Sequence, residues 1–251
     1  MKASSLDAEG RAAARPGPAE AGPANSQDAA TAFVLHELNV YHDAVPHAAA
    51  LNMAIDEALL ETVSEPSLRF YRWRQPALSF GYFGAFAEVA AEAERRELVR
   101  RWTGGGIVPH GDDFTYSVIL PHRAAAEAKS PRVVYTTIHA AIQRALAGTF
   151  AAELARHDAP KVSDACFANP VVADVLLDGR KIAGAAQRRT RAGLLHQGSI
   201  QEQRLPAGFA ASFAAALCAA HQPKPLSHEL LQRAHEIAQA RYATHEWLHR
   251  R

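Results

Sequence analysis

The sequence predicts an α+β fold, in which a single domain has a mixed or antiparallel sheet flanked by helices. Asp178-Gly179 lies between two apolar runs, which is among the strongest short signals for an antiparallel hairpin. Apolar residues recur at helical spacing in residues 51–62 and 132–150. The strand-like runs lie between helices without the regular strand–helix alternation of a doubly wound parallel sheet.

Composition limits the class of protein. The chain has 251 residues, 21% of them charged, and a net charge of +1, which argues against nucleic acid or a membrane as partner. No apolar run has the length that a transmembrane helix requires. Two cysteines are too few for a disulfide framework, so we expect a cytoplasmic protein.

Residues 1–32 differ in composition from the rest of the chain. They are rich in Ala, Gly, Pro and Ser, carry several acids, and lack the apolar core of a secretory signal. We expect a disordered N-terminal tail there, followed by a folded domain over residues 33–251.

The first half of the domain predicts four strands and two helices. Strands are expected at 33–35, 68–73, 77–82 and 98–101, with 77–82 beside 68–73, because their apolar residues are β-branched, aromatic or near-alternating. Pro46 occupies the place of a first helical residue, so a helix should run from there to Thr62. A charged helix is expected over 88–96.

The second half predicts four strands and three helices. A strand at 114–120 follows the glycine loop described below, and a helix follows at 132–150. Strands 171–177, 180–188 and 194–200 should form an antiparallel meander, with turns at Asp178-Gly179 and near Ala192-Gly193. Helices around 207–221 and 227–242 complete the domain.

Three consecutive glycines, Gly104–Gly106, follow Arg100 and Arg101. Glycine costs conformational entropy on folding, so three together indicate a place where side chains do not fit. Such a loop exposes backbone N–H groups, and neighbouring arginines suit a phosphate or a carboxylate. A tight turn that needs positive φ is the alternative explanation.

Several motifs occur in a familiar order. They are Asn-Met-Ala-x-Asp-Glu at 52–57, Arg-Phe-Tyr-Arg-Trp ending at Trp73, Arg-Arg-x-Thr-Gly-Gly-Gly at 100–106 with His110, Gly-Arg-Lys-Ile-Ala-Gly-Ala-Ala-Gln at 179–187, and His-Gln-Gly-Ser at 196–199. Together, from about residue 33 to Trp247, the chain resembles the lipoate–protein ligase A and octanoyltransferase group of the biotin/lipoate ligase superfamily. The resemblance implies a class II biotin/lipoate ligase-like fold.

The resemblance also implies roles for particular residues. Lys181, held among small residues such as Gly184, would polarise the acyl carbonyl, and His196 and Ser199 would close the site. His110 would contact the ligand or merely cap the turn. The other expected ligand contacts are Trp73 and Gly81 along the acyl chain, and Arg101, Thr103, Gly104, Gly105 and Gly106 at the activated carboxyl end.

The implied substrate is a lipoyl or octanoyl group, and the acceptor is a lysine on a lipoyl carrier domain. Such carriers are E2 subunits of 2-oxoacid dehydrogenases and the H protein of glycine cleavage. Two routes remain open. A ligase would use ATP and Mg and form an acyl-adenylate, whereas a transferase would need no cofactor and would take the acyl group from an acyl carrier protein.

Cys166 divides the two routes. One octanoyltransferase branch has a nucleophilic cysteine in a Cys-Phe-x-x-Pro segment, which this chain matches at 166–170. A thiolate can accept an acyl group and pass it to an amine, although a lone cysteine can equally be a small buried hydrophobe. That branch often has arginine where Gly106 stands, and the ligases carry a C-terminal accessory domain, which we do not expect here.

Other interpretations carry less weight. His245-Glu-x-x-His249 matches a zinc motif, but a third ligand is missing downstream, so we expect no metal. Arg188, Arg189 and Arg191 are either a solvated face or a docking patch. A biotin–protein ligase lacks support because its Gly-Arg-Gly-Arg loop is absent. A non-catalytic paralogue that binds acyl carriers is a further alternative.

Overall fold

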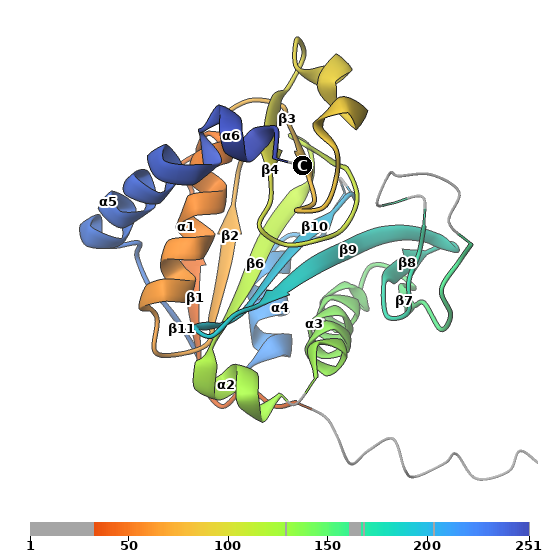
Figure 1. Ribbon diagram of the computed structural model, residues 1–251. Helices are drawn as coiled ribbons and strands as arrows, with labels where there is room; N and C mark the ends of the chain where they lie inside the picture. Colours follow the sequence, from red (N-terminus) through yellow and green to blue (C-terminus); the bar gives the residue numbers. More distant parts are fainter. Residues whose placement is uncertain (1–32, 129, 161–166, 168, 203, 251) are drawn as a thin grey trace, which may run out of the picture. The chain divides into compact units, whose positions relative to one another are not determined.

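A mixed sheet of eight strands forms the centre of the computed structural model, which describes residues 33–128, 130–160, 167, 169–202 and 204–250 (Figure 1). The strands are β1 (Leu38–His42), β2 (Ser67–Tyr71), β6 (Phe114–Pro121), β7 (Glu153–Leu154), β8 (Val175–Leu177), β9 (Arg180–Arg189), β10 (Gly193–Ile200) and β11 (His221–Pro223). Their order across the sheet is β11-β1-β2-β6-β10-β9-β8-β7. A separate three-stranded sheet has the order β4-β3-β5, from β3 (Ala77–Phe80), β4 (Glu97–Arg100) and β5 (Val108–His110). The expected α+β class is confirmed.

The predicted meander is confirmed as β8, β9 and β10, which pair antiparallel in sequence order. Asp178 and Gly179 have φ values of 51° and 73°, the left-handed conformation that a two-residue hairpin turn requires. β1 is parallel to β2 and β11, whereas β2, β6 and β10 are antiparallel neighbours. The sheet is therefore mixed, as expected.

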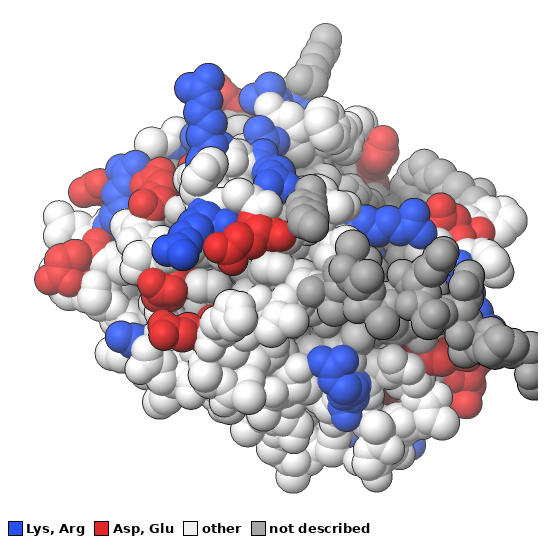
Figure 2. Space-filling model, turned by 90° about the horizontal axis from the view of Figure 1, so that it is seen from below, with Lys and Arg blue, Asp and Glu red and all other residues white. Residues whose placement is uncertain are grey.

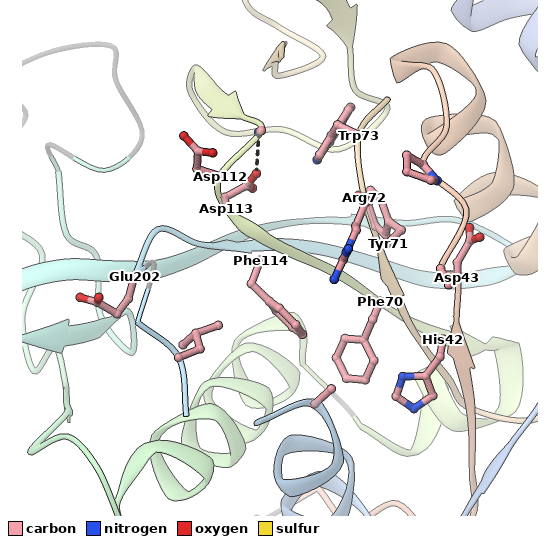
Figure 3. A pocket seen from close by; sticks show the side chains of 15 residues that line it. His42, Asp43, Phe70, Tyr71, Arg72, Trp73, Asp112, Asp113, Phe114 and Glu202 are labelled. Atoms are coloured by element: carbon pink, nitrogen blue, oxygen red, sulfur yellow. Dashed lines mark hydrogen bonds between the residues drawn. The ribbon is translucent and has the colours of Figure 1, made fainter. Parts of the chain in front are cut away.

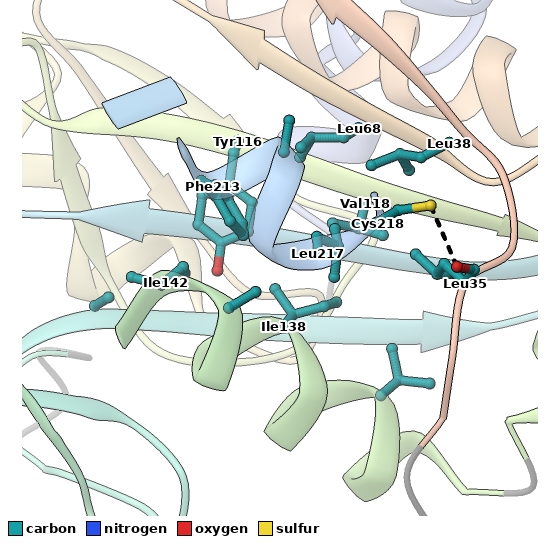
Figure 4. Packing of buried hydrophobic residues seen from close by; sticks show 14 of the residues in the cluster. Leu35, Leu38, Leu68, Tyr116, Val118, Ile138, Ile142, Phe213, Leu217 and Cys218 are labelled. Atoms are coloured by element: carbon teal, nitrogen blue, oxygen red, sulfur yellow. Dashed lines mark hydrogen bonds between the residues drawn. The ribbon is translucent and has the colours of Figure 1, made fainter. Parts of the chain in front are cut away.

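Helices cover both faces of the large sheet (Figure 1). α1 (Ala49–Thr62) and α5 (His228–Ile237) pack together, and α3 (Pro131–Leu146) and α4 (Phe209–Leu217) form a second pair. Shorter elements are α2 (His122–Glu127), a π turn (Ala238–Tyr242) and α6 (His245–Leu248). Figure 4 shows Tyr116 of β6, Ile138 of α3 and Phe213 of α4 in one apolar cluster. Burying a side chain of this size contributes about 1.5–3 kcal/mol.

Three expectations about the first elements are wrong. The first strand begins at Leu38 rather than Phe33. Pro46 does not open α1, because His47 pairs with Trp73 in an isolated β-bridge and the chain stays extended until Ala48. The strand expected at 77–82 does not lie beside β2, since it pairs with β4 and β5 in the smaller sheet.

The helix expected over 88–96 is also wrong. Two 3-10 turns, Phe86–Glu88 and Ala90–Glu92, occupy this region. Only Val89 of this segment belongs to an apolar cluster as a buried residue. A short charged segment with a single buried anchor lacks the apolar stripe that stabilises an α-helix by packing.

Charges of both signs are mixed on the face seen in Figure 2, where blue and red side chains alternate beside a broad uncharged area. That face carries no extended field of one sign. None of the helices in the described part of the chain combines the length and apolarity needed to cross a membrane.

Candidate functional site

Two adjoining cavities lie where the small sheet meets β9 and β10. The inner slot is lined by Met53, Tyr71, Trp73, Ser79, Arg101, Val108, His110, Thr115, Gly184, Ala185, Ala186, Gln197, Gly198 and Ser199. The outer cleft is lined by Phe80, Gly81, Phe83, Gly84, Glu88, Gly105, Gly106, Ile107, Ala159, Asn169, Val171, Lys181 and Ala185. Ala185 lines both, so the slot and the cleft are neighbours.

The structure brings the glycine loop and Lys181 to the same cavity, although 75 residues separate Gly106 from Lys181. The cleft is about 580 Å³ in volume, whereas the slot behind it leaves only about 30 Å³ open to water-sized molecules. An acyl chain entering the slot would therefore have to displace side chains.

Arg101 fixes the glycine loop from inside. Its guanidinium donates to the carbonyls of Gly104 and Gly106, at 3.0 and 2.9 Å, and to the Ser79 hydroxyl at 2.6 Å. Gly105 has a φ of 87°, which favours glycine. Within the described residues, no hydrogen bond uses the N–H groups of Gly104, Gly105 or Gly106. With its carbonyls held by Arg101, the loop has its amides available to an anion.

Gly81 supports the loop rather than the slot. A Cβ atom at this position would lie 2.8 Å from the backbone carbon of Gly104 and would overlap the carbonyl oxygen of Gly105. The loop can approach β3 this closely only because residue 81 has no side chain. The requirement for glycine at 81 is therefore steric.

Lys181 lies in a buried polar cluster that sequence analysis missed. Its Nζ lies 2.8 Å from Oδ2 of Asp174, and their side chains are 3% and 0% exposed. Asp174 also accepts from the Tyr135 hydroxyl, at 2.5 Å, and from the backbone N–H of Val171, at 2.7 Å. The Tyr135 oxygen in turn accepts from the Ala185 N–H. Several donors thus compensate the buried carboxylate.

Gly184 makes room for the Lys181 side chain, because a Cβ there would overlap Cε and lie 2.7 Å from Nζ. One signal for Asp174 was present in the sequence. An aspartate precedes the hairpin turn in an apolar strand, and a lysine follows the turn. Tyr135 comes from α3, so only the tertiary fold reveals its part.

A second polar chain crosses the inner slot. The Ser79 hydroxyl lies 2.6 Å from Nε2 of His110, and Nδ1 of His110 lies 2.8 Å from Oδ2 of Asp113. Asp113 also accepts from Ser199, at 2.6 Å, and from Thr115. The sequence predicted His110 and Ser199 near the ligand, and both line the slot.

Trp73 closes the same slot on another side. Its indole ring stacks on His110 with centroids 4.1 Å apart, and its N–H donates to the Thr115 hydroxyl.

Burial lowers the pKa of His110, although Asp113 opposes the shift. For Asp113, burial acts to raise the pKa, but the contacts with His110 and Ser199 outweigh it and the pKa is lowered. His110 is therefore neutral and Asp113 ionised at neutral pH.

Thr103 anchors the base of the glycine loop. Its hydroxyl donates to Gln197, which donates to Asp56, and Asp56 accepts from the fully buried Arg69. Asn52 also accepts from Arg69, at 2.7 Å. Asn52 and Asp56 of the Asn-Met-Ala-x-Asp-Glu motif thus fix the sheet beneath the site, and Met53 of the same motif lines the inner slot.

Arg100 does not reach the cleft as part of an anion site. Its guanidinium donates to the carbonyls of Tyr82, Gly84, Trp247, Leu248 and Arg250. It therefore fastens the C-terminal segment to the loop after β3. The expectation that both paired arginines face a ligand is not met for this one.

His196 and Ser199 do not meet at one site. Ser199 lines the slot, whereas His196 lies on the opposite face of β10, where it stacks near Tyr116 and contacts Gln187. Burial lowers the pKa of His196 well below its ordinary value. His196 is therefore a neutral core residue that contacts neither cavity.

Cys166 lies outside the described residues. The next residue, Phe167, is described, and its ring centroid lies 5.3 Å from Nζ of Lys181. The Phe167 ring therefore lies beside Lys181.

The described residues contain no group of three His, Cys, Asp or Glu side chains that could hold a metal ion. His245 and His249 stack on each other, with ring centroids 3.7 Å apart. The donor set of the cleft fits a phosphate or carboxylate through the glycine loop, and within the described ranges it offers no metal cage.

A side groove of about 650 Å³ lies behind Tyr71 and Trp73, which line both this groove and the inner slot (Figure 3). Figure 3 shows Phe70, Arg72 and Phe114 directed toward its middle, with Asp112 and Glu202 at the rim. Of the residues expected at the site, only Trp73 lines this groove.

Comparison with known proteins bears on this site. The sequence matches the lipoyl protein ligase A/B catalytic domain family over residues 48–204. Octanoyltransferase LipM of Oceanobacillus iheyensis is 39% identical over 165 residues, which cover 62% of this chain and 60% of that protein. Octanoyltransferase LipM of Brevibacillus brevis is 30% identical over 262 residues, which cover 80% of this chain and 95% of that protein. The chain spans about 60% of the length of several such relatives.

Two solved structures show the same fold. Lipoate-protein ligase A bound with ATP superposes with a TM-score of 0.63 at 19% identity, covering 86% of this chain and 98% of that one. A bi-partite lipoate protein ligase from Thermoplasma acidophilum, described with its E2 lipoyl domain, gives a TM-score of 0.58 at 19% identity, covering 85% and 96%.

Proposed function

Since the chain belongs to the lipoyl protein ligase A/B catalytic domain family, we propose that it attaches a lipoyl or octanoyl group to the acceptor lysine of lipoyl carrier domains. The meeting of the glycine loop and Lys181 in one cleft carries this proposal. The family match and the named relatives favour a lipoyl or octanoyl group over biotin. The presence of both Lys181 and the complete glycine loop in this chain argues for catalysis over mere carrier binding.

Lys181 and the loop would act on the acyl carbonyl together. The ammonium and the loop N–H groups, which no hydrogen bond among the described residues uses, are donors that would stabilise negative charge on oxygen in the tetrahedral transition state. Asp174 holds Lys181 in place at 2.8 Å, so little reorganisation is needed when that charge develops. The alkyl chain would lie in the inner slot between Trp73 and the small residues of β9.

We favour transfer of an octanoyl group from a carrier thioester through Cys166. The Cys166 thiol would give up its proton and attack the donor's carbonyl carbon. An enzyme thioester forms, the bond between the carbonyl carbon and the donor's sulfur breaks, and the donor's thiolate takes up that proton and leaves as a thiol. The acceptor amine would then attack this thioester, forming the amide and returning the thiol. The octanoyltransferase names of the relatives and the position of Phe167 beside Lys181 support this route.

The ligase route is the second candidate, favoured by the Gly104–Gly106 loop. ATP, when bound with Mg, would supply activation of a free carboxylate. The loop amides would hold an anionic group there, and Lys181 would orient the carbonyl. Metal coordination would depend mainly on phosphates, since the described residues supply no cluster for it.

The test compares the wild-type protein with the variant Cys166→Ser. Each is incubated with a lipoyl carrier domain and either octanoyl carrier protein or octanoate with ATP and Mg, and the carrier is weighed by mass spectrometry. We expect octanoylation by wild type from the carrier thioester without ATP, and its loss in Cys166→Ser. Unchanged, ATP-dependent activity of the variant would select the ligase route, and no acylation under either condition would reject the proposed function.

A further inference from the structure

Phe83 is the most exposed of the large apolar side chains in the described residues, at 88%. It lies at the lip of the outer cleft, in the loop that follows β3. A single exposed apolar residue is common on protein surfaces and needs no explanation by itself. Its setting is what distinguishes Phe83.

The backbone on both sides of Phe83 is fixed. Arg100, buried to 1% exposure, donates to the carbonyl of Tyr82 at 3.0 Å and to that of Gly84 at 2.6 Å. The same guanidinium holds the carbonyl of Arg250 at 2.7 Å. The loop is thus held from within on both sides of Phe83, whose side chain faces solvent.

Two arginines lie over the ring of Tyr82, the residue before Phe83. The Cζ atom of Arg250 lies 4.5 Å from the ring centroid of Tyr82, and that of Arg188 lies 4.7 Å from it. Tyr82 and Phe83 pack edge to face, with centroids 4.9 Å apart. We call Tyr82, Phe83, Arg188 and Arg250 the docking rim. Aromatic residues and arginine are the side chains most enriched at the energetic centres of protein interfaces.

We propose that the docking rim binds the folded carrier domain that presents the acceptor lysine. This proposal rests on the proposed function. The acceptor lysine must enter through the cleft to reach Lys181. The surface of the carrier domain around the acceptor lysine therefore has to lie against the lip of the cleft. The matching surface would offer an apolar contact to Phe83 and carboxylates to Arg188 and Arg250. Glu88, the acidic residue that lines the cleft, would face the cationic acceptor side chain.

The test separates docking from chemistry by using two acceptors. Hydroxylamine is a small nucleophile that yields octanoyl hydroxamate from either activated intermediate, whereas the carrier domain must dock. For Phe83→Ser we expect kcat/KM for the carrier domain to fall about tenfold, mainly through KM, because truncating an interface anchor typically costs this much. Hydroxamate formation should stay within about twofold of wild type.

Arg250→Glu should weaken carrier transfer about fivefold and reduce its dependence on salt, since a rim charge acts chiefly on association. Val45→Ser is the matched control, because Val45 is 64% exposed but lies between β1 and α1. It should change neither reaction.

Unchanged carrier transfer by Phe83→Ser would overturn the proposal. An equal loss with hydroxylamine would also overturn it, since the rim would then serve the acyl donor or the chemistry. If wild type forms neither product from octanoyl carrier protein or from octanoate with ATP, the proposed function itself fails.

Discussion

Asp174 determines how Lys181 is held. Both side chains are almost fully buried and lie 2.8 Å apart, with Tyr135 as a third member. Removing one partner of such a pair leaves an uncompensated buried charge. The interaction therefore matters for stability as well as for the geometry of the amine.

Asp174→Asn should lower the free energy of unfolding by about 3 kcal/mol and reduce acyl transfer with it. Urea denaturation measures the first effect and carrier acylation the second. Glu61→Gln is the control, because Glu61 pairs with Arg233 at 2.8 Å with both side chains partly exposed. Breaking that surface pair should cost less than about 1 kcal/mol. Equal costs for the two variants would contradict the assignment.

His139 should make the fold sensitive to acid. Burial lowers its pKa from 6.5 to about 4. Below pH 6.5 the unfolded chain binds a proton on this histidine and the native state does not, so stability falls as pH drops toward 4. The loss amounts to about 3 kcal/mol for this one group.

The variant His139→Asn keeps a donor for the carbonyl of Ala173, which His139 contacts through Nδ1 at 2.7 Å. We expect the free energy of unfolding of this variant to fall less steeply between pH 6.5 and 4 than that of the wild type. Urea denaturation at several pH values measures it. The lowered pKa of His196 leaves some pH dependence in the variant. An unchanged slope would exclude His139 as a source of acid sensitivity.

At the scale of elements, the glycine loop depends on its close contact with β3. Gly81→Ala would push against the backbone of Gly104 and Gly105, so the loop must move. We expect acyl transfer to fall at least about tenfold, since small displacements of catalytic groups have large effects on rate. Gly148→Ala is the control, because a Cβ there meets no atom within 4 Å. Full activity in Gly81→Ala would show that the loop position is unimportant.

Local signals predicted most elements correctly. The Asp178-Gly179 turn specifies its own backbone conformation, so the meander of β8 to β10 follows from the sequence. Tertiary pairing decided the rest. The strand at Ala77–Phe80 joined a second sheet, and His47 delayed the start of α1, because each pairs with residues distant in sequence.

In the whole molecule, local motifs likewise predicted one part of the site and tertiary packing decided the other. The motifs identified Lys181, the glycine loop, His110 and Ser199, which line the two adjoining cavities. They could not reveal Tyr135 or the docking rim, since these depend on how α3 and the C-terminal segment pack. His196 is the opposite case, since the motif indicated a site residue that the fold places elsewhere. Alternation along β10 puts His196 on the face away from Ser199.

In the proposed mechanism, one acyl carboxyl group lies between the glycine loop and Lys181. A crystal structure of the protein with octanoate tests it most directly. We predict the carboxylate within hydrogen-bonding distance of Nζ of Lys181 and of the loop N–H groups, with the alkyl chain in the inner slot beside Trp73. Octanoate in the side groove of Figure 3, with the cleft empty, would contradict it.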